Sequence, residues 1–374
     1  MAGIYIHIPF CKRACNYCNF HFSTSLKHKD SLIDAILLEI DQRATEWQHL
    51  QFDTLYFGGG TPSLLPVGDI EKLLNKLYQK FSISGYSEIT LEGNPDDFTI
   101  KKLQAYRQMG INRLSIGVQS FFEEDLQKLN RSHNTRQAER SILLAQETGI
   151  ANITIDLIYG IPGLSDQKWL QNIQKVIDFN IPHVSAYALT VEPKTALAWQ
   201  IKNRKFPKVS EEQSARQFYI LREKLLAHDF EHYEISNFAK KSFESKHNSH
   251  YWQNIPYLGL GPAAHSYKDR QRRWNVANNA LYIKNINTGQ YFETENLTKK
   301  DVFNELLMTG LRTSHGVNLE SIAGLGETYI NYLHRQMAKY VENQQLLIEN
   351  NYLKAASETW FIVEGIISDL FMMV

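Results

Sequence analysis

Short apolar runs alternate with longer amphipathic stretches over the first 240 residues of the chain. A short apolar run favours a buried strand, and apolar positions three and four residues apart favour a helix that buries one face. The strands expected on this basis are Ile4–Ile8, Thr54–Phe57, Ile89–Glu92, Arg113–Ile116, Ile153–Ile158 and Val184–Leu189. The helices between them are expected near residues 29–45, 67–81, 99–109, 134–148 and 166–178.

Repeated units of one strand followed by one helix predict a parallel sheet, because each crossover helix returns the chain to the same edge of the sheet. Six such units favour an α/β fold, a partial (β/α)6 TIM-like barrel that occupies residues 1–240. A doubly wound open sheet is the competing topology, and hydrophobic periodicity alone does not separate the two.

The pattern changes after residue 240, where two further parts of the chain are expected. Residues 241–298 are expected to connect the two domains, since residues 242–280 are rich in His, Asn, Tyr, Trp and Gly and have poor periodicity. Residues 299–374 are expected to form a smaller, mainly helical C-terminal domain, with amphipathic stretches at Asp301–Leu311 and Glu327–Asn343. The run Trp360–Ile367 favours a short final strand.

Composition narrows the class of protein. Lysine and arginine total 40, as do aspartate and glutamate, so the chain shows no electrostatic footprint for a nucleic acid partner. No apolar run approaches the roughly 18 residues that a membrane span needs, and the first apolar stretch leads directly into Cys11 without a signal-peptide pattern. A cytoplasmic protein without a transmembrane segment is expected. Peripheral membrane association and a homodimer are compatible with this composition.

The three cysteines of the chain, Cys11, Cys15 and Cys18, form a C-x3-C-x2-C pattern directly after the first apolar run. An odd number of clustered cysteines argues against a disulfide framework and for a reducing compartment. Three thiolates on a short loop can hold three irons of a cubane iron–sulfur cluster and leave the fourth iron open. A zinc site with His7 or His21 as fourth ligand is the leading alternative, although zinc sites usually pair two C-x2-C units.

A glycine-rich turn follows the second expected strand and consists of Gly58, Gly59, Gly60, Thr61 and Pro62. Glycines at the carboxyl end of a parallel strand let the backbone approach a ligand, and their N–H groups can bind an anionic group. Triple glycines also form plain tight turns, so this motif alone leaves ligand binding open.

Polar side chains recur at or near the ends of other expected strands. Glu92 ends the third strand, Gln119 follows the fourth, and Asp156 lies inside the fifth. A carboxylate in a buried strand needs a partner, because burying it alone costs several kcal/mol. Each of these residues could form a structural ion pair, but three polar groups that face one barrel mouth favour a polar ligand. Arg131 is placed to supply a bidentate contact to a carboxylate.

These motifs follow one another in the order seen in radical S-adenosylmethionine (SAM) enzymes. The chain resembles the oxygen-independent coproporphyrinogen III oxidase family of that group, and the resemblance extends over nearly its whole length, to residues 310–317. The motifs that carry it are Cys11–Cys18, Gly58–Pro62, Leu91–Pro95, Gly117–Ser120 and Asp156–Pro162.

The resemblance implies a [4Fe–4S] cluster on the three cysteines, whose open iron chelates S-adenosylmethionine. It places Tyr5 beside the cluster and the glycine motif against the methionine amino end of the cofactor. It also implies that four polar residues contact the cofactor, namely Glu92, Gln119, Arg131 and Asp156. One-electron reduction would then cleave the sulfonium to a 5′-deoxyadenosyl radical, which is chemistry of the cofactor.

Two features depart from the oxidases of this family and resemble its heme chaperone branch instead. The oxidases carry a further cysteine two positions after the third, where this chain has Phe20. They also have an N-terminal extension before the cluster, whereas Cys11 lies almost at the start here. The expected function is therefore heme binding and delivery to an acceptor hemoprotein, such as a membrane respiratory enzyme. Oxidative decarboxylation of coproporphyrinogen III is the alternative, and a zinc-stabilised binding protein is a third.

A motif in the connecting segment agrees with the chaperone branch. The sequence H-N-x-x-Y-W runs from His247 to Trp252, and the resemblance associates it with heme binding. An imidazole beside Tyr and Trp offers an axial ligand and a flat apolar surface to a porphyrin. His247 is the expected heme ligand in preference to His250, and His265 is a further candidate for a structural or porphyrin contact. In isolation, such a motif more often marks a hydrogen-bonded histidine in a packed loop.

Overall fold

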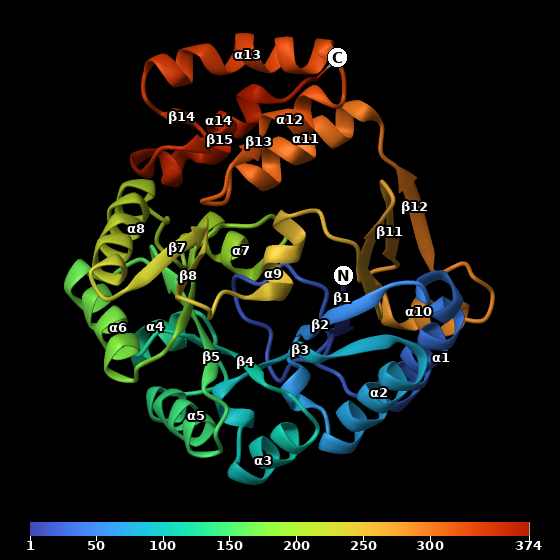
Figure 1. Ribbon diagram of the computed structural model, residues 1–374. Coiled ribbons are helices and arrows are strands. Elements are labelled where there is room, and N and C mark those ends of the chain that lie inside the picture. Colours follow the sequence, from blue (N-terminus) through green and yellow to red (C-terminus); the bar gives the residue numbers. More distant parts are fainter. Residues whose placement is uncertain (374) are drawn as a thin grey trace.

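Twelve strands form a single sheet in the computed structural model, which describes residues 1–373 (Figure 1). Along the sheet the strands run in the order β12-β11-β10-β9-β1-β2-β3-β4-β5-β6-β8-β7. The parallel centre consists of β1 (Ala2–Ile8), β2 (Gln51–Gly59), β3 (Ser82–Gly93), β4 (Arg113–Gln119), β5 (Asn152–Tyr159) and β6 (His183–Ala188). Beyond β6 lie the antiparallel strands β8 (Asn237–Lys240) and β7 (Phe230–Glu234).

The order of the parallel strands decides between the two topologies that periodicity left open. Each strand from β1 to β6 pairs with the next one in the chain, so every crossover moves in the same direction around the sheet. A doubly wound sheet would reverse direction at a switch point. The sheet curves into an open barrel, and the helices between its strands cover the outside (Figure 1). The prediction of a partial TIM-like barrel is confirmed.

The helices outside the barrel lie where the hydrophobic pattern placed them. They are α1 (Lys29–Trp47), α2 (Val67–Lys80), α3 (Ile100–Gln108), α5 (Thr135–Glu147) and α6 (Asp166–Asp178). The pattern did not predict α4 (Glu123–Lys128), α7 (Ala196–Lys202) or α8 (Glu211–Leu226). The first two are too short to show a helical period.

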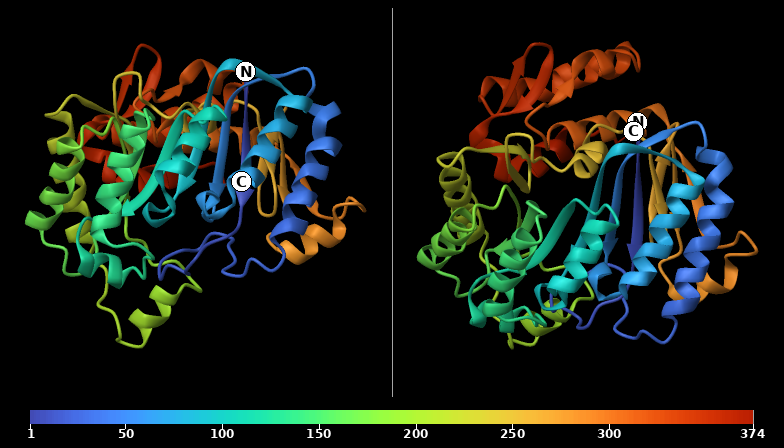
Figure 2. Two further views of the ribbon diagram at one scale, coloured as in Figure 1. Left: turned by 90° about the horizontal axis from the view of Figure 1, so that it is seen from below. Right: turned by 60° about the horizontal axis from the view of Figure 1, so that its bottom comes forward.

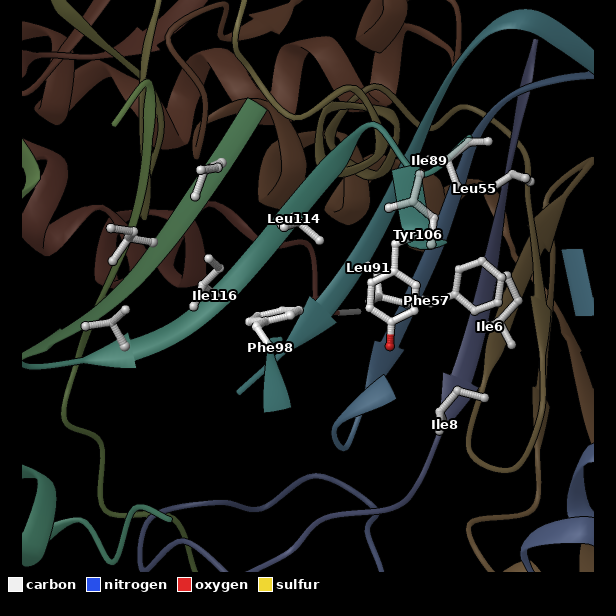
Figure 3. Close-up of a cluster of buried hydrophobic side chains, with 14 of the residues drawn as sticks. Ile6, Ile8, Leu55, Phe57, Ile89, Leu91, Phe98, Tyr106, Leu114 and Ile116 are labelled. Atoms are coloured by element: carbon white, nitrogen blue, oxygen red, sulfur yellow. The ribbon is translucent and has the colours of Figure 1, made fainter. Parts of the chain in front are cut away.

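Side chains alternate between the two faces of the parallel strands, as the two-residue period of a strand requires. One face packs against the outer helices: Leu55, Phe57 and Leu91 are fully buried there, with Tyr106 of α3 lying against them (Figure 3). The opposite face points into the barrel. The strands that form the core therefore also present a second row of side chains to the barrel interior.

Residues 241–298 extend the barrel sheet and do more than connect two domains. β9 (Tyr257–Leu260) pairs in parallel with β1, and β10 (His265–Lys268), β11 (Gln271–Asn275) and β12 (Phe292–Asn296) follow as antiparallel neighbours. The same stretch contains α9 (Lys246–Trp252) and α10 (Asn279–Asn285). The sheet thus continues past the boundary expected at residue 240, because strands of four or five residues are too short to show a clear two-residue period.

The C-terminal residues form a smaller unit with its own core. Its helices are α11 (Lys299–Gly310), α12 (Leu319–Ala323), α13 (Glu327–Glu342) and α14 (Val363–Leu370). A small sheet joins β13 (Val317–Asn318), β14 (Leu346–Glu349) and β15 (Tyr352–Ala355). Most buried apolar residues of this unit form a cluster separate from the barrel core, whereas Trp360 packs into the barrel core. No helix within residues 1–373 combines the length and apolarity needed to cross a membrane.

The final strand predicted at Trp360–Ile367 is wrong. A 3-10 helix covers Ser357–Ile362 and α14 follows directly. Val363, Ile366 and Leu370 of α14 are buried and lie three and four residues apart, which is helical spacing. A short apolar run suits a buried strand and a buried helix equally, and here the helical spacing prevails.

Backbone hydrogen bonds fasten the C-terminal unit to one edge of the barrel. The N–H of Ile235 donates to the carbonyl of Arg312 at 2.8 Å, and the N–H of Ser314 donates to the carbonyl of Tyr233 at 3.0 Å. Arg312 also forms a bidentate ion pair with Glu364, with N–O distances of 2.7 and 2.6 Å. The unit, orange to red in Figure 1, therefore lies across the open side of the barrel between β7 and β12.

The carboxyl group of Glu234, at this junction, makes stability depend on pH. Burial raises its pKa from the ordinary 4.5 to about 7, and among the described residues its Oε1 atom has no hydrogen-bond partner. Between these two pKa values the folded protein holds a proton that the unfolded chain has lost. The free energy of unfolding therefore falls as the pH rises through this window.

A Glu234→Gln variant is expected to lose this pH dependence. Above the folded-state pKa, the variant should exceed the parent protein in unfolding free energy by about 3 kcal/mol, because each unit between the two pKa values corresponds to about 1.4 kcal/mol. The difference should shrink to nothing as the pH falls toward 4.5. Urea denaturation of both proteins at about pH 5 and about pH 8 measures it. If the unfolding free energy of the two proteins changed equally with pH, this role of Glu234 would be contradicted.

Candidate functional site

The three cysteines lie on a loop that leaves β1 and is closed at its base by backbone hydrogen bonds. We call residues 10–23 the cysteine loop. The N–H of Cys11 donates to the carbonyl of Ser23 at 3.0 Å, and the N–H of Ser23 donates to the carbonyl of Pro9 at 2.6 Å. In the middle of the loop, the side-chain amide of Asn16 donates to the carbonyl of Lys128 at 2.8 Å. These bonds hold the thiols at one end of the barrel.

A cavity of approximately 770 Å³ opens beside the cysteine loop at the carboxyl ends of the parallel strands. Most of the candidate residues line it: Cys11, Cys15, Cys18, Gly59, Gly60, Thr61, Glu92, Gln119, Arg131 and Asp156. Tyr5, Gly58 and His247 are not among the lining residues. A cavity of this volume lies in the range that holds cofactors and drug-sized ligands.

The pairing register of the strands explains why the polar residues meet. Glu92 of β3 pairs with Ser115 of β4, and Ser115 pairs with Thr154 of β5. Two residues further along β5, Asp156 pairs with Ser185 of β6. Directly paired residues point to the same face of a sheet, and so do residues two apart in one strand. All five side chains therefore line the same cavity.

Glu92 is a carboxylate inside the barrel with two donors directed at it. The O–H of Tyr56 donates to Oε1 at 2.7 Å, and the N–H of Gly59 donates to Oε2 at 3.2 Å. Burial raises the pKa of Glu92 above its ordinary value in spite of both donors. Gly59 thus links the glycine motif to Glu92 through its backbone.

Asp156 shares the barrel interior with Glu92. Burial, followed by the negative charge of Glu92, raises the pKa of Asp156 to about 7, although Ser115 Oγ donates to it at 3.3 Å. Within residues 1–373 neither carboxyl group forms an ion pair with a lysine, arginine or histidine. Two such groups favour a ligand that brings positive charge.

Arg131 connects the cysteine loop with the barrel wall. Its Nη1 donates to Sγ of Cys15 at 3.2 Å and to the hydroxyl of Tyr17 at 3.3 Å. Its Nη2 donates to the carbonyl of Gly117 at 2.8 Å and to Asn94. Both ends of the guanidinium are thus engaged by the protein, and Nε alone lacks a partner among the described residues.

The glycine motif has a structural role of its own. Gly59 has a φ of 109°, and a Cβ atom there would lie 2.5 Å from Nδ1 of His7. A Cβ atom on Gly60 would lie 2.8 Å from the backbone N and O of Phe10. Glycine is therefore needed where the end of β2 packs closely against the end of β1 and the residue Phe10 that follows it. Contact between this motif and the cofactor stays a prediction.

The zinc alternative finds no compact ligand set in the part of the chain that the structure describes, because no three His, Cys, Asp or Glu side chains there converge on one metal position. The ring nitrogens of His7 lie 3.0 Å from the hydroxyl of Tyr5 and 3.0 Å from the carbonyl of His21. Nε2 of His21 lies 2.7 Å from Oδ1 of Asn279. A cubane cluster needs less convergence, since each thiolate binds a different iron.

His247 lies behind the cavity wall and is 1% exposed. Its Nδ1 is 2.8 Å from the hydroxyl of Thr54, and its Nε2 is 3.0 Å from the hydroxyl of Tyr251. Burial, with a smaller effect of His250, lowers its pKa to about 3, so the ring is neutral. Coordination of heme iron by His247 requires one of these hydrogen bonds to open, and that role stays a prediction.

The other two candidate histidines also lie off the cavity. Nε2 of His250 is 3.6 Å from a carboxylate oxygen of Asp53, and burial lowers the pKa of His250. His265 is exposed and stacks on Trp274, with ring centroids 6.3 Å apart. None of the three histidines therefore lines the cavity beside the cysteine loop.

Sequence reasoning missed two groups of residues that line the cavity. The first shares the interior face of the strands with Glu92 and Asp156 and consists of Tyr56, Thr90, Arg113, Ser115, Thr154, Ser185 and Tyr187. The two-residue alternation around Glu92 and Asp156 is the signal that could have found them. The second group, Trp360, Phe361 and Glu364, belongs to the C-terminal unit. It reaches the cavity only through tertiary packing.

The donor set at the cysteine loop fits an iron–sulfur cluster. Two donors are directed at sulfur: Arg131 at Cys15, and Thr61, whose hydroxyl lies 3.5 Å from Sγ of Cys11. The Thr61 hydroxyl favours the thiolate of Cys11, which is the form that binds iron, although burial raises the pKa of that thiol to about 11. Beyond the thiols, the interior carboxyl groups suit a cationic ligand such as a sulfonium.

Comparison with known proteins places the chain in a family. The sequence profile of the radical SAM superfamily matches residues 5–176. The heme chaperone HemW of Bacillus subtilis (strain 168) is 35% identical over 327 residues, which cover 86% of this chain and 86% of that protein. The chain belongs to the HemW family of radical SAM proteins.

A second HemW family member agrees with this assignment, and a solved structure has the same fold. The heme chaperone HemW of Lactococcus lactis subsp. lactis (strain IL1403) is 32% identical over 343 residues, covering 92% of this chain and 90% of that protein. The structure of coproporphyrinogen III oxidase (HemN) from Escherichia coli, a radical SAM enzyme, superposes with a TM-score of 0.85 at 21% identity and covers 100% of this chain and 90% of that one. That likeness shows the fold alone.

Proposed function

We propose that this chain is a heme chaperone that holds a [4Fe–4S] cluster and S-adenosylmethionine in its barrel and delivers heme to an acceptor hemoprotein. The observation that carries the proposal is the 35% identity to a heme chaperone along 86% of the chain. The acceptor class expected is a membrane respiratory hemoprotein. The three thiols and the polar cavity beside them support the cofactor part.

In this proposal the cysteines bind three irons, and the open fourth iron supplies one-electron chemistry to a bound sulfonium cofactor. This chain's residues position and shield that centre. Arg131 directs a cation at Cys15 and ties the cysteine loop to the barrel wall through Gly117. Burial raises the pKa of Glu92 and of Asp156, so a cationic group bound beside them would stabilise their ionised forms and gain a counter-charge.

The cavity offers few cations to a porphyrinogen with several carboxylates. Of the arginines that line it, Arg113 and Arg131 are engaged by protein groups, and Arg13 is exposed. Arg113 donates to Asn152 at 2.8 Å and to Thr154 at 2.9 Å, and Arg131 is engaged as described above. Glu192 and Glu364 add further acids to the wall.

Two assays on the reconstituted protein test this function. Added heme should produce a Soret band, and the loaded protein should pass heme to an apo-hemoprotein such as apomyoglobin. Coproporphyrinogen III, with S-adenosylmethionine and a reductant, should not be decarboxylated. Decarboxylation would overturn the chaperone assignment in favour of the oxidase, and the absence of a Soret shift on adding heme would remove heme binding.

A His247→Ala variant is expected to weaken the Soret band at least tenfold at limiting heme. Because His247 is buried and hydrogen-bonded, its loss also removes contacts with Thr54 and Tyr251. A Thr54→Val variant is the matched control, since it breaks one hydrogen bond but keeps the imidazole. The ligand role requires a band that is weak in His247→Ala and intact in Thr54→Val. Equal bands in both variants would leave His247 a structural residue.

A further inference from the structure

A strongly basic loop projects from the barrel next to the cysteine loop. We call residues 190–209, which link β6 to α8 and contain α7, the basic loop. It carries five basic residues and one acid, Glu192, in a chain whose opposite charges balance overall. The basic residues are Lys194, Lys202, Arg204, Lys205 and Lys208, and all five are exposed.

Apolar side chains anchor the basic loop to the barrel, so its charged side chains project from an ordered backbone. Leu197 is 1% exposed, and Ile201, Phe206 and Val209 pack against the barrel core. The hydroxyl of Thr195 caps α7 by accepting a hydrogen bond from the N–H of Ala198. A partner that binds here would therefore meet a preformed surface, which lowers the entropy lost on binding.

An exposed tryptophan lies among these charges. Trp199 is 54% exposed, and the Nζ atom of Lys205 lies 4.7 Å from the centre of its ring. Tryptophan and arginine are the residue types most enriched among those that dominate binding energy at protein interfaces. An exposed Trp199 with the Lys205 cation over its ring has no role in the barrel core and suits a docking surface for an acidic partner.

The basic loop lies directly outside the cysteine loop. The N–H of Leu197 donates to the carbonyl of Asn16 at 2.7 Å, and Asn16 lies between Cys15 and Cys18 in the chain. Figure 2 (left) shows α7, in yellow-green, projecting from the end of the barrel where the dark-blue cysteine loop lies. A protein bound to the basic loop is therefore held against the outer side of the cysteine loop.

We propose that the basic loop docks a small acidic electron-carrier protein that passes one electron to the cluster on the cysteine loop. This inference rests on the proposed function, because it requires the cluster. The carrier is oxidised by one electron, the cluster is reduced by one, and no bond or proton moves in the transfer. An electron crosses protein efficiently only over short distances, so the carrier must bind where the cysteine loop is closest to the surface. Complementary charge steers its approach and orients it.

Direct binding tests the surface without relying on the cluster. The probe is a flavodoxin, an acidic protein whose flavin absorbs visible light, mixed with the full chain and followed by sedimentation velocity. A complex is expected at low salt that weakens as salt screens the charges. A Lys202→Glu/Arg204→Glu/Lys205→Glu variant should lower the affinity at least tenfold.

The matched control reverses three exposed charges elsewhere. Lys101, Arg140 and Arg335 lie on α3, α5 and α13, and all three are exposed. A Lys101→Glu/Arg140→Glu/Arg335→Glu variant carries the same net change and should keep the affinity of the parent. Equal losses in both triple variants would show a general charge effect and overturn the docking surface.

Reduction of the reconstituted cluster gives a second readout. Flavodoxin hydroquinone should bleach the cluster absorption at least tenfold more slowly in the basic-loop variant, while dithionite should reduce both proteins alike. Binding to phosphatidylglycerol vesicles without binding to flavodoxin would overturn the proposal in favour of a membrane surface. If no cluster assembles, the proposed function fails, and the sedimentation result still decides whether the basic loop binds an acidic protein.

Discussion

A Cys15→Ala variant is expected to show no iron–sulfur absorption after anaerobic reconstitution with iron and sulfide, whereas the parent protein turns brown. The cluster needs three thiolates, and the chain has three cysteines in all, so no other thiol can take the place of the missing one. The substitution also leaves the Nη1 atom of Arg131 without its sulfur partner. The fold should persist, because the hydrogen bonds that close the cysteine loop use the backbone of Cys11 and Ser23.

Phe20→Ala is the matched control for this loss. Phe20 lies on the same loop, lines the same cavity and is 70% exposed, but it carries no group that binds iron. Its variant should keep the full absorption and the parent's iron content. Iron bound by Cys15→Ala at the parent's level would remove the cysteine ligand set. A colourless parent protein that binds one zinc ion instead would remove both radical SAM functions, chaperone and oxidase.

The parallel part of the barrel could be predicted from the sequence, because its strands are short apolar runs that alternate with amphipathic helical stretches. Runs such as Ile153–Ile158 stand out against the polar helix faces around them, and the caps Thr99 and Ser165 mark where helices begin. The extension of the sheet beyond β1 could not be predicted this way. It depends on which strand edges pair, as β9 pairs with β1 although Gly3 and Tyr257 are 254 positions apart, and local periodicity carries no record of such partners.

The candidate site residues show the same difference between what the local sequence pattern predicts and what tertiary packing decides. The sequence could point to Glu92 and Asp156, because a carboxylate in an apolar run conflicts with its surroundings. The placement of His247 was not found, since its neighbours Thr54 and Tyr5 come from distant strands that bury the ring. A motif at a fixed spacing shows which residues are close in the chain, whereas burial is decided by the elements that pack over them.

A Gly59→Ala variant is expected to destabilise the protein by about 3 kcal/mol or more, because a side chain at a left-handed φ costs about 1–3 kcal/mol and a buried neighbour must also move. The new Cβ would lie 2.5 Å from Nδ1 of His7. That ring cannot easily retreat, since His7 is 5% exposed and both of its nitrogens lie within hydrogen-bond distance of partners. Urea denaturation measures the loss, and reconstitution should show less cluster, because His7 contacts the cysteine loop at His21.

Gly68→Ala provides the control, since a Cβ on Gly68 in α2 meets nothing within 4 Å. Alanine there should change stability by at most about 1 kcal/mol, toward greater stability, because it favours the helix. Adding His7→Ala to Gly59→Ala removes the ring that the new Cβ strikes, so the two losses should be clearly less than additive. Additive losses would show that backbone strain at residue 59 alone destabilises the variant. Wild-type stability of Gly59→Ala would show that the paired ends of β1 and β2 accommodate the added methyl group without cost. Contact with the ligand would then be the remaining explanation for glycine at this position.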